Sequence, residues 1–307
     1  MKNQKNENEL SSRIPIIISW IAMILASSLG IIIWREFEGQ EPNWWPLVNL
    51  GGILIIFVIT LYSPLLRSLR AFMVILLIIF LLGFGGGWQW GLIYFVRNSE
   101  IWIGLENSLP WAISSILTHL LRLSPALIIM LFLLLIGRSR SDLFLIKGDI
   151  VALANPTKIL GMKEPKPWPR LAVPFVIVFS IGTLTFLILT THYTFQVFLA
   201  TLPLIPVVIF IAAINGFNEE FTLRAAPLSE TSKAIGQTQG LLITTIFFGI
   251  GHYYGVPNGL IGVLLSTFLG WFLGKSMLET KGFFWAWLIH FTIDIFIFFF
   301  YAMSIVA

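Results

Sequence analysis

The chain has 307 residues, of which 57% are hydrophobic, 15% aromatic and only 11% charged. An average soluble domain is about 25% charged, so this composition excludes an ordinary soluble globular protein. The net charge of +4 lies mainly in short segments between apolar runs, which argues against a nucleic-acid partner. The lack of cysteine excludes disulfides, thiolate metal sites and cysteine nucleophiles.

Apolar runs occupy most of the chain after a polar segment at residues 1–13, which is predicted to be a disordered cytoplasmic tail. Continuous runs of this kind are expected to be helices, because a helix satisfies all its own backbone groups inside a lipid bilayer. They cover residues 14–34, 46–62, 71–96, 109–136, 171–191, 197–217, 239–254, 257–274 and 283–303. The sequence therefore predicts an all-α, polytopic transmembrane helical bundle with about eight or nine spans.

The charges between the runs predict orientation and organisation. Segment 137–170 contains seven basic and three acidic residues together with four prolines, whereas acidic residues predominate at 35–45 and 97–108. Since Lys and Arg favour the cytoplasmic side, we expect an integral protein of a bacterial-type plasma membrane with a cytoplasmic N-terminus. Segment 137–170 is then a cytoplasmic linker between an N-terminal transmembrane region (14–136, about four spans) and a C-terminal core (171–307).

Ionisable residues cluster inside the apolar C-terminal core, where burying charge is costly and usually indicates function. The run that ends near residue 217 is followed by Glu219 and Glu220. Glu220 and Arg224 are spaced i,i+4, so they share a helical face and are expected to pair. Glu219 projects about 100° away from that face. We therefore predict that Glu219 is the free carboxylate and a candidate general base.

Two further pairs on later helices have the same i,i+4 spacing. Phe248 can pack against the imidazole of His252, and Asp294 can orient His290 or donate to a substrate when protonated. Each pair alone has a structural interpretation, such as a solvated helix end or a satisfied contact between helices. His119 and His192, which have no such neighbours, are interpreted in that way. Three polar groups on successive helices of a chain with little charge favour one joint site, which we expect to open to the cytoplasmic side.

The order of these groups resembles a known family. Its pattern is Glu-Glu-x-x-x-Arg, then Phe-x-x-x-His, then His-x-x-x-Asn/Asp. The sequence thus resembles the CAAX protease and bacteriocin-processing family (CPBP, or Abi) of intramembrane proteases, related to the type II CAAX prenyl endopeptidases, over about residues 170–303. Three positions depart from the common pattern. Arg224 is flanked by Leu223 and Ala225 in place of the frequent Phe and Gly, and Asp294 replaces the Asn of the eukaryotic enzymes.

The resemblance implies an endopeptidase that hydrolyses a peptide or membrane-protein substrate in the lipid bilayer. It implies that Glu219 and His252 hold and deprotonate the attacking water, and that His290 and Asp294 stabilise the oxyanion. The implied supporting residues are Glu220, Arg224 and Phe248. It assigns no role to the N-terminal spans.

Three alternatives remain open on the sequence. Zinc is one, with His252, His290 and Glu219 as its ligands, although the glutamate mechanism requires no cofactor and no His-Glu-x-x-His helix is present. The second is a non-catalytic scaffold or immunity-type protein that binds a partner in the same pocket. The third is a proton-coupled transporter, which is disfavoured because the charges form one cluster and no repeat is visible.

Overall fold

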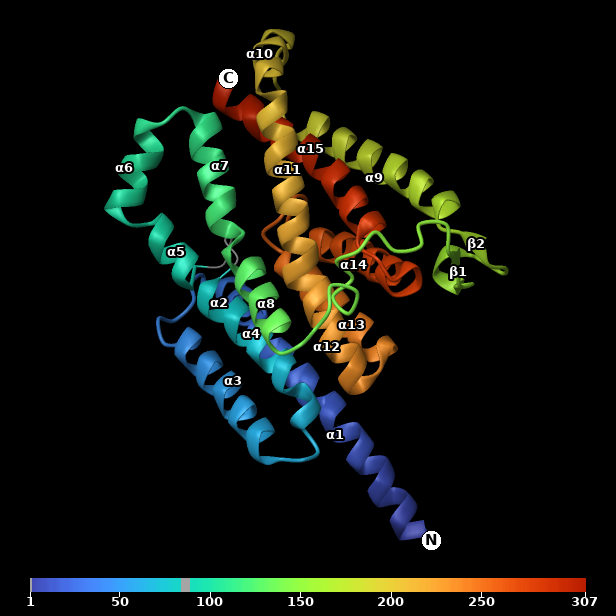
Figure 1. Ribbon diagram of the computed structural model, residues 1–307. Coiled ribbons are helices and arrows are strands. Elements are labelled where there is room, and N and C mark those ends of the chain that lie inside the picture. The colour runs from blue at the N-terminus through green and yellow to red at the C-terminus, as the bar shows by residue number, and fades with distance from the viewer. Residues whose placement is uncertain (1, 84–88) are drawn as a thin grey trace.

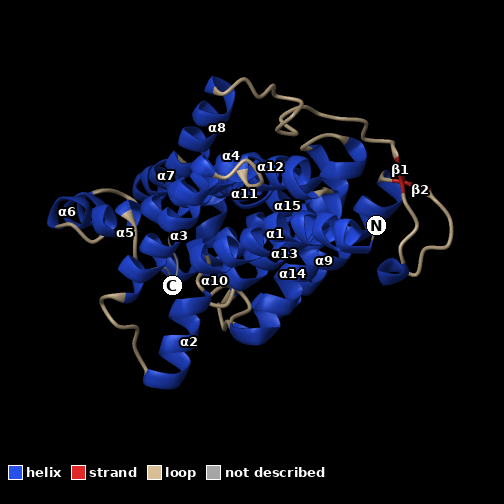
Figure 2. Cartoon of the chain, turned by 90° about the horizontal axis from the view of Figure 1, so that it is seen from below, coloured by secondary structure: helices blue, strands red, loops and turns tan. Residues whose placement is uncertain are grey.

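The computed structural model describes residues 2–83 and 89–307, with side chains described from residue 13 onward. Its described part is almost entirely helical, and its one sheet has two short strands (Figure 2). The all-α prediction is confirmed. The N-terminal helices are α1 (Lys2–Ala26), α2 (Leu29–Glu38), α3 (Trp45–Tyr62), η1 (Arg67–Leu69), α4 (Arg70–Leu82), α5 (Leu92–Arg97), α6 (Glu100–Ser108), α7 (Trp111–Arg122) and α8 (Ser124–Leu135).

The remaining elements form the linker and the C-terminal core. In the linker they are β1 (Leu153–Ala154), η2 (Lys158–Leu160) and β2 (Lys166–Pro167). In the core they are α9 (Pro169–Thr190), α10 (Phe195–Thr201), η3 (Leu202–Leu204), α11 (Ile205–Glu220), η4 (Phe221–Ala225), α12 (Ala226–Ile235), α13 (Gln237–Gly251), α14 (Gly259–Thr280) and α15 (Phe284–Val306). Helix α1 begins at Lys2, so the segment predicted to be a disordered tail is helical from that residue.

The number of candidate membrane spans is smaller than predicted. Six helices among the described residues are long and apolar enough to cross a bilayer, or seven if the bent pair Arg13–Ala26 and Leu29–Glu38 forms one span. Three predicted runs account for the difference. The run 14–34 bends by 53°, α4 of the run 71–96 ends at Leu82, and α13 has only 15 residues. These helices are apolar because they pack against neighbouring helices, which hydropathy alone does not distinguish from contact with lipid.

The N-terminal helices pack directly on the core. Figure 1 shows α7 and α8 beside α11, and α1 contacts both α12 and α13. The Trp20 indole N–H donates to Gln239 Oε1 (3.0 Å), and the Ser28 hydroxyl donates to the Ile250 carbonyl (3.2 Å). The α13 helix, which ends next to His252, is therefore held on one side by the N-terminal region.

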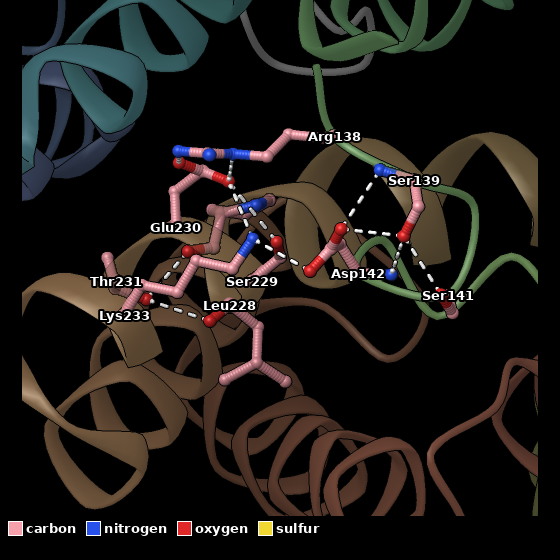
Figure 3. A network of polar contacts seen from close by, with 10 residues as sticks. Arg138, Ser139, Ser141, Asp142, Leu228, Ser229, Glu230, Thr231 and Lys233 are labelled. Carbon is pink, nitrogen blue, oxygen red and sulfur yellow. Dashed lines mark hydrogen bonds and ion pairs between the residues drawn. The ribbon is translucent and has the colours of Figure 1, made fainter. Parts of the chain in front are cut away.

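The beginning of the linker is tied to α12 by a network of ion pairs (Figure 3). Arg138 donates through Nε and Nη2 to the two carboxylate oxygens of Glu230, at 2.8 Å each. Lys233 lies 3.3 Å from Asp142, and hydrogen bonds from Ser139 hold the pKa of Asp142 at about 2. The carboxylate of Glu230 is 1% exposed, so its bidentate pair with Arg138 fixes the start of the linker on the helix that follows the candidate site.

The rest of the linker runs along the ends of α14 and α15. Asp149 N donates to Thr280 O (2.8 Å), and the Trp285 indole N–H donates to the Ile150 carbonyl (2.8 Å). The strands β1 and β2 then pair antiparallel, with Leu153 opposite Pro167. The prolines restrict this segment to short elements, and its backbone hydrogen bonds join it to the core.

Two glycines allow the core helices to approach closely. A Cβ atom on Gly216 of α11 would lie 3.3 Å from the backbone nitrogen of Phe291 on α15. A Cβ atom on Gly249 of α13 would lie 1.9 Å from Thr267 Oγ1 and 3.0 Å from the Val263 carbonyl, both on α14. These contacts pack α11 on α15 and α13 on α14, and three of these four helices carry or adjoin candidate site residues.

Replacing Gly249 with Ala is expected to destabilise the protein. The added methyl group must separate α13 from α14, and overpacking of this kind costs about 1–3 kcal/mol. The gain in helix propensity, about 1 kcal/mol, offsets only part of that cost. Thermal unfolding of the purified protein should show a lower Tm for Gly249→Ala. Gly251→Ala is the matched control, because a Cβ atom there meets no atom within 4 Å. An equal Tm for the two variants would contradict the close packing.

Candidate active site

The two adjacent glutamates lie where α11 changes to the π-helical turn η4. Ala226 N–H bonds to Phe221 O, five residues earlier, and the helix then continues as α12. Pro227 has no N–H to donate to the preceding turn, which favours this irregularity. π-turns inserted in α-helices occur often at functional sites. Glu219 and Glu220 are 8% and 0% exposed, so both carboxylates are buried here.

Glu220 forms the predicted ion pair with Arg224 and also reaches α15. Arg224 Nη1 contacts Glu220 Oε1, and the same oxygen lies 2.7 Å from His290 Nδ1. An ionised carboxylate only accepts hydrogen bonds, so Nδ1 of His290 carries a proton and donates it to Glu220. Arg224 is 0% exposed and its guanidinium lies 4.3 Å from the centre of the Phe248 ring. Arg224, Glu220 and His290 thus form a buried chain that fixes the imidazole.

Glu219 is not part of that pair, as predicted, and its two oxygens have different surroundings. Oε1 accepts a hydrogen bond from Asn215 Nδ2 (3.1 Å) and lies 3.7 Å from Arg122 Nη2. Oε2 lies 3.7 Å from His252 Nε2 and 3.6 Å from His290 Nε2. One oxygen is therefore held, and the other faces both imidazoles.

His252 follows the last residue of α13 and is the most exposed of these groups, with 25% of its side chain accessible. Its Nδ1 lies 2.9 Å from the Phe248 carbonyl, which can only accept a hydrogen bond, so Nδ1 carries the proton. In the neutral imidazole, Nε2 is then an acceptor directed toward Glu219. The Phe248 ring packs against the imidazole with 4.2 Å between ring centres.

Asp294 completes the cluster from α15. Its Oδ2 accepts a hydrogen bond from Asn215 Nδ2 (2.9 Å) and lies 3.6 Å from His290 Nε2. The Asn215 amide therefore bridges the carboxylates of Glu219 and Asp294. Figure 1 shows the two helices that carry them, α11 and α15, packed side by side.

The charges of the cluster balance when His290 is an imidazolium. The carboxylates are those of Glu219, Glu220 and Asp294, and the guanidinium groups are those of Arg122 and Arg224. Between them lies the imidazole of His290, with a carboxylate near each of its two nitrogens. A buried charge without a partner is strongly destabilising. With His290 as an imidazolium, the three negative charges face three positive charges, and both imidazole nitrogens are donors.

Two residues of the cluster were missed by the sequence reasoning. Asn215 lies four residues before Glu219 on the same helical face, so i,i+4 spacing is the signal that could have found it. Arg122 lies in the apolar run 109–136, outside the three polar groups that the sequence singled out. The two histidines interpreted as structural lie elsewhere: His119 Nδ1 contacts the Ser115 carbonyl (2.8 Å), and His192 is exposed.

The metal alternative has no preformed ligand set. Among residues 2–83 and 89–307, no group of three or more His, Asp or Glu side chains has the spacing that a metal ion requires. Glu219 Oε2 and the Nε2 atoms of the two imidazoles, at 3.6–3.7 Å, face a small shared space.

Residues 201–296 match the family model described as type II CAAX prenyl endopeptidase Rce1-like. This segment is an Rce1-like domain. It includes Glu219, Glu220, Arg224, His252 and His290, and the other two predicted site residues, Phe248 and Asp294, also fall inside it. The Rce1-like domain is narrower than the expected range of 170–303, and Arg122 lies outside it. Comparisons with curated proteins and with solved structures gave no match.

The motifs predicted from the sequence therefore lie in a segment that is similar to the type II CAAX prenyl endopeptidases. That family and the apolar helices together make the protein an integral membrane protein with a protease-like domain. The N-terminal helices α1–α8 precede the domain and contribute Arg122 to its polar cluster.

Proposed function

We propose that the protein is an intramembrane endopeptidase in which Glu219 and His252 activate a water molecule. The proposal rests on the arrangement of two hydrogen-bond acceptors, one on Glu219 and one on His252. Glu219 Oε2 and the unprotonated Nε2 of His252 lie 3.7 Å apart, too far for a direct hydrogen bond. A water that donates one O–H to each would direct its oxygen lone pairs away from both. Glu219 then takes the proton as the water attacks a peptide carbonyl.

His290 and Asp294 are proposed to stabilise the negative oxygen that forms on the attacked carbonyl. His290 Nδ1–H is occupied by Glu220, so the group available to the substrate is Nε2–H of the imidazolium. A donor held in place before the reaction lowers the barrier because it does not have to reorient; single donors of this kind contribute about 2.7–4 kcal/mol. Asp294 beside Nε2 supports the imidazolium charge.

The test is to map new peptide termini in membranes that contain wild-type protein, Glu219→Ala or His290→Ala. We expect a set of termini that depends on wild-type protein and is lost in both variants. His192→Ala is the matched control, because His192 is exposed and lies outside the cluster, and it should retain the wild-type termini. Unchanged termini in all four samples, with binding of a partner protein retained, would favour the scaffold and contradict the protease.

Metal dependence is tested in the same assay. The proposed mechanism needs no metal, so a zinc chelator should leave the termini unchanged, and loss of cleavage restored by added Zn²⁺ would replace the proposed water activation with metal activation.

A further inference from the structure

Arg122 is a half-buried cation in an unfavourable place. It lies near the middle of Trp111–Leu135, a candidate span in which it is the only charged residue. A charged side chain at that depth is strongly unfavourable unless it has a partner. The nearest carboxylate oxygen is Glu219 Oε1, at 3.7 Å from Nη2. The buried Nε atom has no hydrogen-bond partner in the part of the chain that the structure describes.

Arg122 and Asn215 approach the same oxygen of the Glu219 carboxylate. This oxygen is Oε1, and the two residues reach it from α7 and α11 respectively. Oε2 is left facing His252 and His290. Without the two contacts on Oε1, rotation about the last side-chain bond would exchange the two oxygens or place neither of them opposite the imidazoles.

We propose that Arg122 is a positioning residue, supplied by the N-terminal region, that orients Glu219 and balances its charge. It touches neither the proposed water nor the substrate and acts through the carboxylate. The Rce1-like domain at 201–296 would then be incomplete without α7. The effect on cleavage rests on the proposed function, whereas the energetic coupling between Arg122 and Glu219 does not.

The coupling is tested by thermal unfolding of four purified full-length proteins: wild type, Arg122→Gln, Glu219→Gln and the double variant. Each single variant leaves one buried charge unpaired and should lower Tm by several degrees. The double variant removes both charges, so its Tm should lie above the value expected from adding the two losses. Strictly additive losses would overturn the inference. If Arg122→Gln does not fold, Arg122→Met, which also removes the charge, takes its place in the cycle.

The positioning role is tested by kinetics on the most readily cleaved member of an internally quenched peptide library, with the protein in liposomes. Displacing a catalytic group by about 1 Å costs about 10²-fold in rate. We expect kcat of Arg122→Gln to fall about 10-fold to 100-fold with KM nearly unchanged, and Arg122→Lys to recover part of that loss.

Different outcomes separate the possible failures. A raised KM with unchanged kcat would show that Arg122 binds substrate and would overturn the positioning role. If kcat and KM of the folded Arg122→Gln protein equal those of wild type, Arg122 only stabilises the fold and the positioning role is overturned. If wild-type protein cleaves no peptide, the proposed function fails, while the unfolding cycle still decides whether Arg122 and Glu219 are coupled. Arg70→Gln is the control for general destabilisation, since Arg70 donates to the Thr60 and Leu61 carbonyls away from the site.

Discussion

Glu219→Gln is expected to reduce peptide cleavage by about 10²–10⁴-fold while leaving the protein folded. The glutamine side chain has nearly the same volume and keeps an oxygen that Asn215 can contact, but it cannot take a proton from water. The loss should appear in kcat, because the carboxylate acts in the transition state. The measurement is cleavage of an internally quenched peptide by purified protein in liposomes.

The matched control is Glu164→Gln, the same chemical change at an exposed position of the linker. It should cleave at the wild-type rate. A Glu219→Gln variant with at least a tenth of wild-type kcat would contradict the assignment of Glu219 as the base and would direct attention to Asp294, the other carboxylate near His290 Nε2.

Arg224→Ala is expected to have the largest effect on stability. Both partners of the Arg224–Glu220 pair are 0% exposed, so removing the guanidinium leaves the Glu220 carboxylate buried beside His290 alone. Breaking a buried pair from one side typically costs about 3–5 kcal/mol. The variant should show a strongly lowered Tm. Any folded fraction should cleave poorly, because His290 loses the chain that fixes it.

A double variant separates the unpaired charge from the lost packing. Arg224→Met with Glu220→Gln removes both charges and keeps most of the buried volume, so it should recover much of the stability lost in Arg224→Ala. Arg140→Ala is the surface control and should change the free energy of unfolding by less than about 0.5 kcal/mol. A similar loss in Arg140→Ala and Arg224→Ala would mean that the pair contributes little.

The local part of the site could be predicted because a helix fixes which side chains share a face. The spacing of Glu220 and Arg224 predicted their ion pair, which the structure shows. Glu219, one position earlier in the chain, was predicted to lie outside that pair, as it does. The spacing of His290 and Asp294 likewise placed imidazole and carboxylate on one face. These relations depend on 3.6 residues per turn and need no knowledge of neighbouring helices.

Contacts between helices could not be predicted in the same way. The His290 Nδ1 bond to Glu220 joins α15 to α11, and the Arg122 contact with Glu219 joins α7 to α11. Both depend on how helices distant in the sequence pack, which in turn depends on close contacts such as that of Gly216 with Phe291. The described residues contain fewer candidate spans than predicted for a related reason: an apolar helix is equally compatible with lipid and with a protein interior.

The sequence by itself determined that the chain is a helical membrane protein, that ionisable residues cluster inside its apolar C-terminal core, and which residues pair within each helix. Only the tertiary structure decided that Asn215 bridges Glu219 and Asp294, that Glu220 rather than Asp294 holds His290 Nδ1, and that Arg122 from the N-terminal region reaches the same cluster. The physical reason is that helical periodicity fixes the direction in which a side chain leaves its helix. The partner of that side chain on another helix depends on how the two helices pack, which local sequence patterns do not predict.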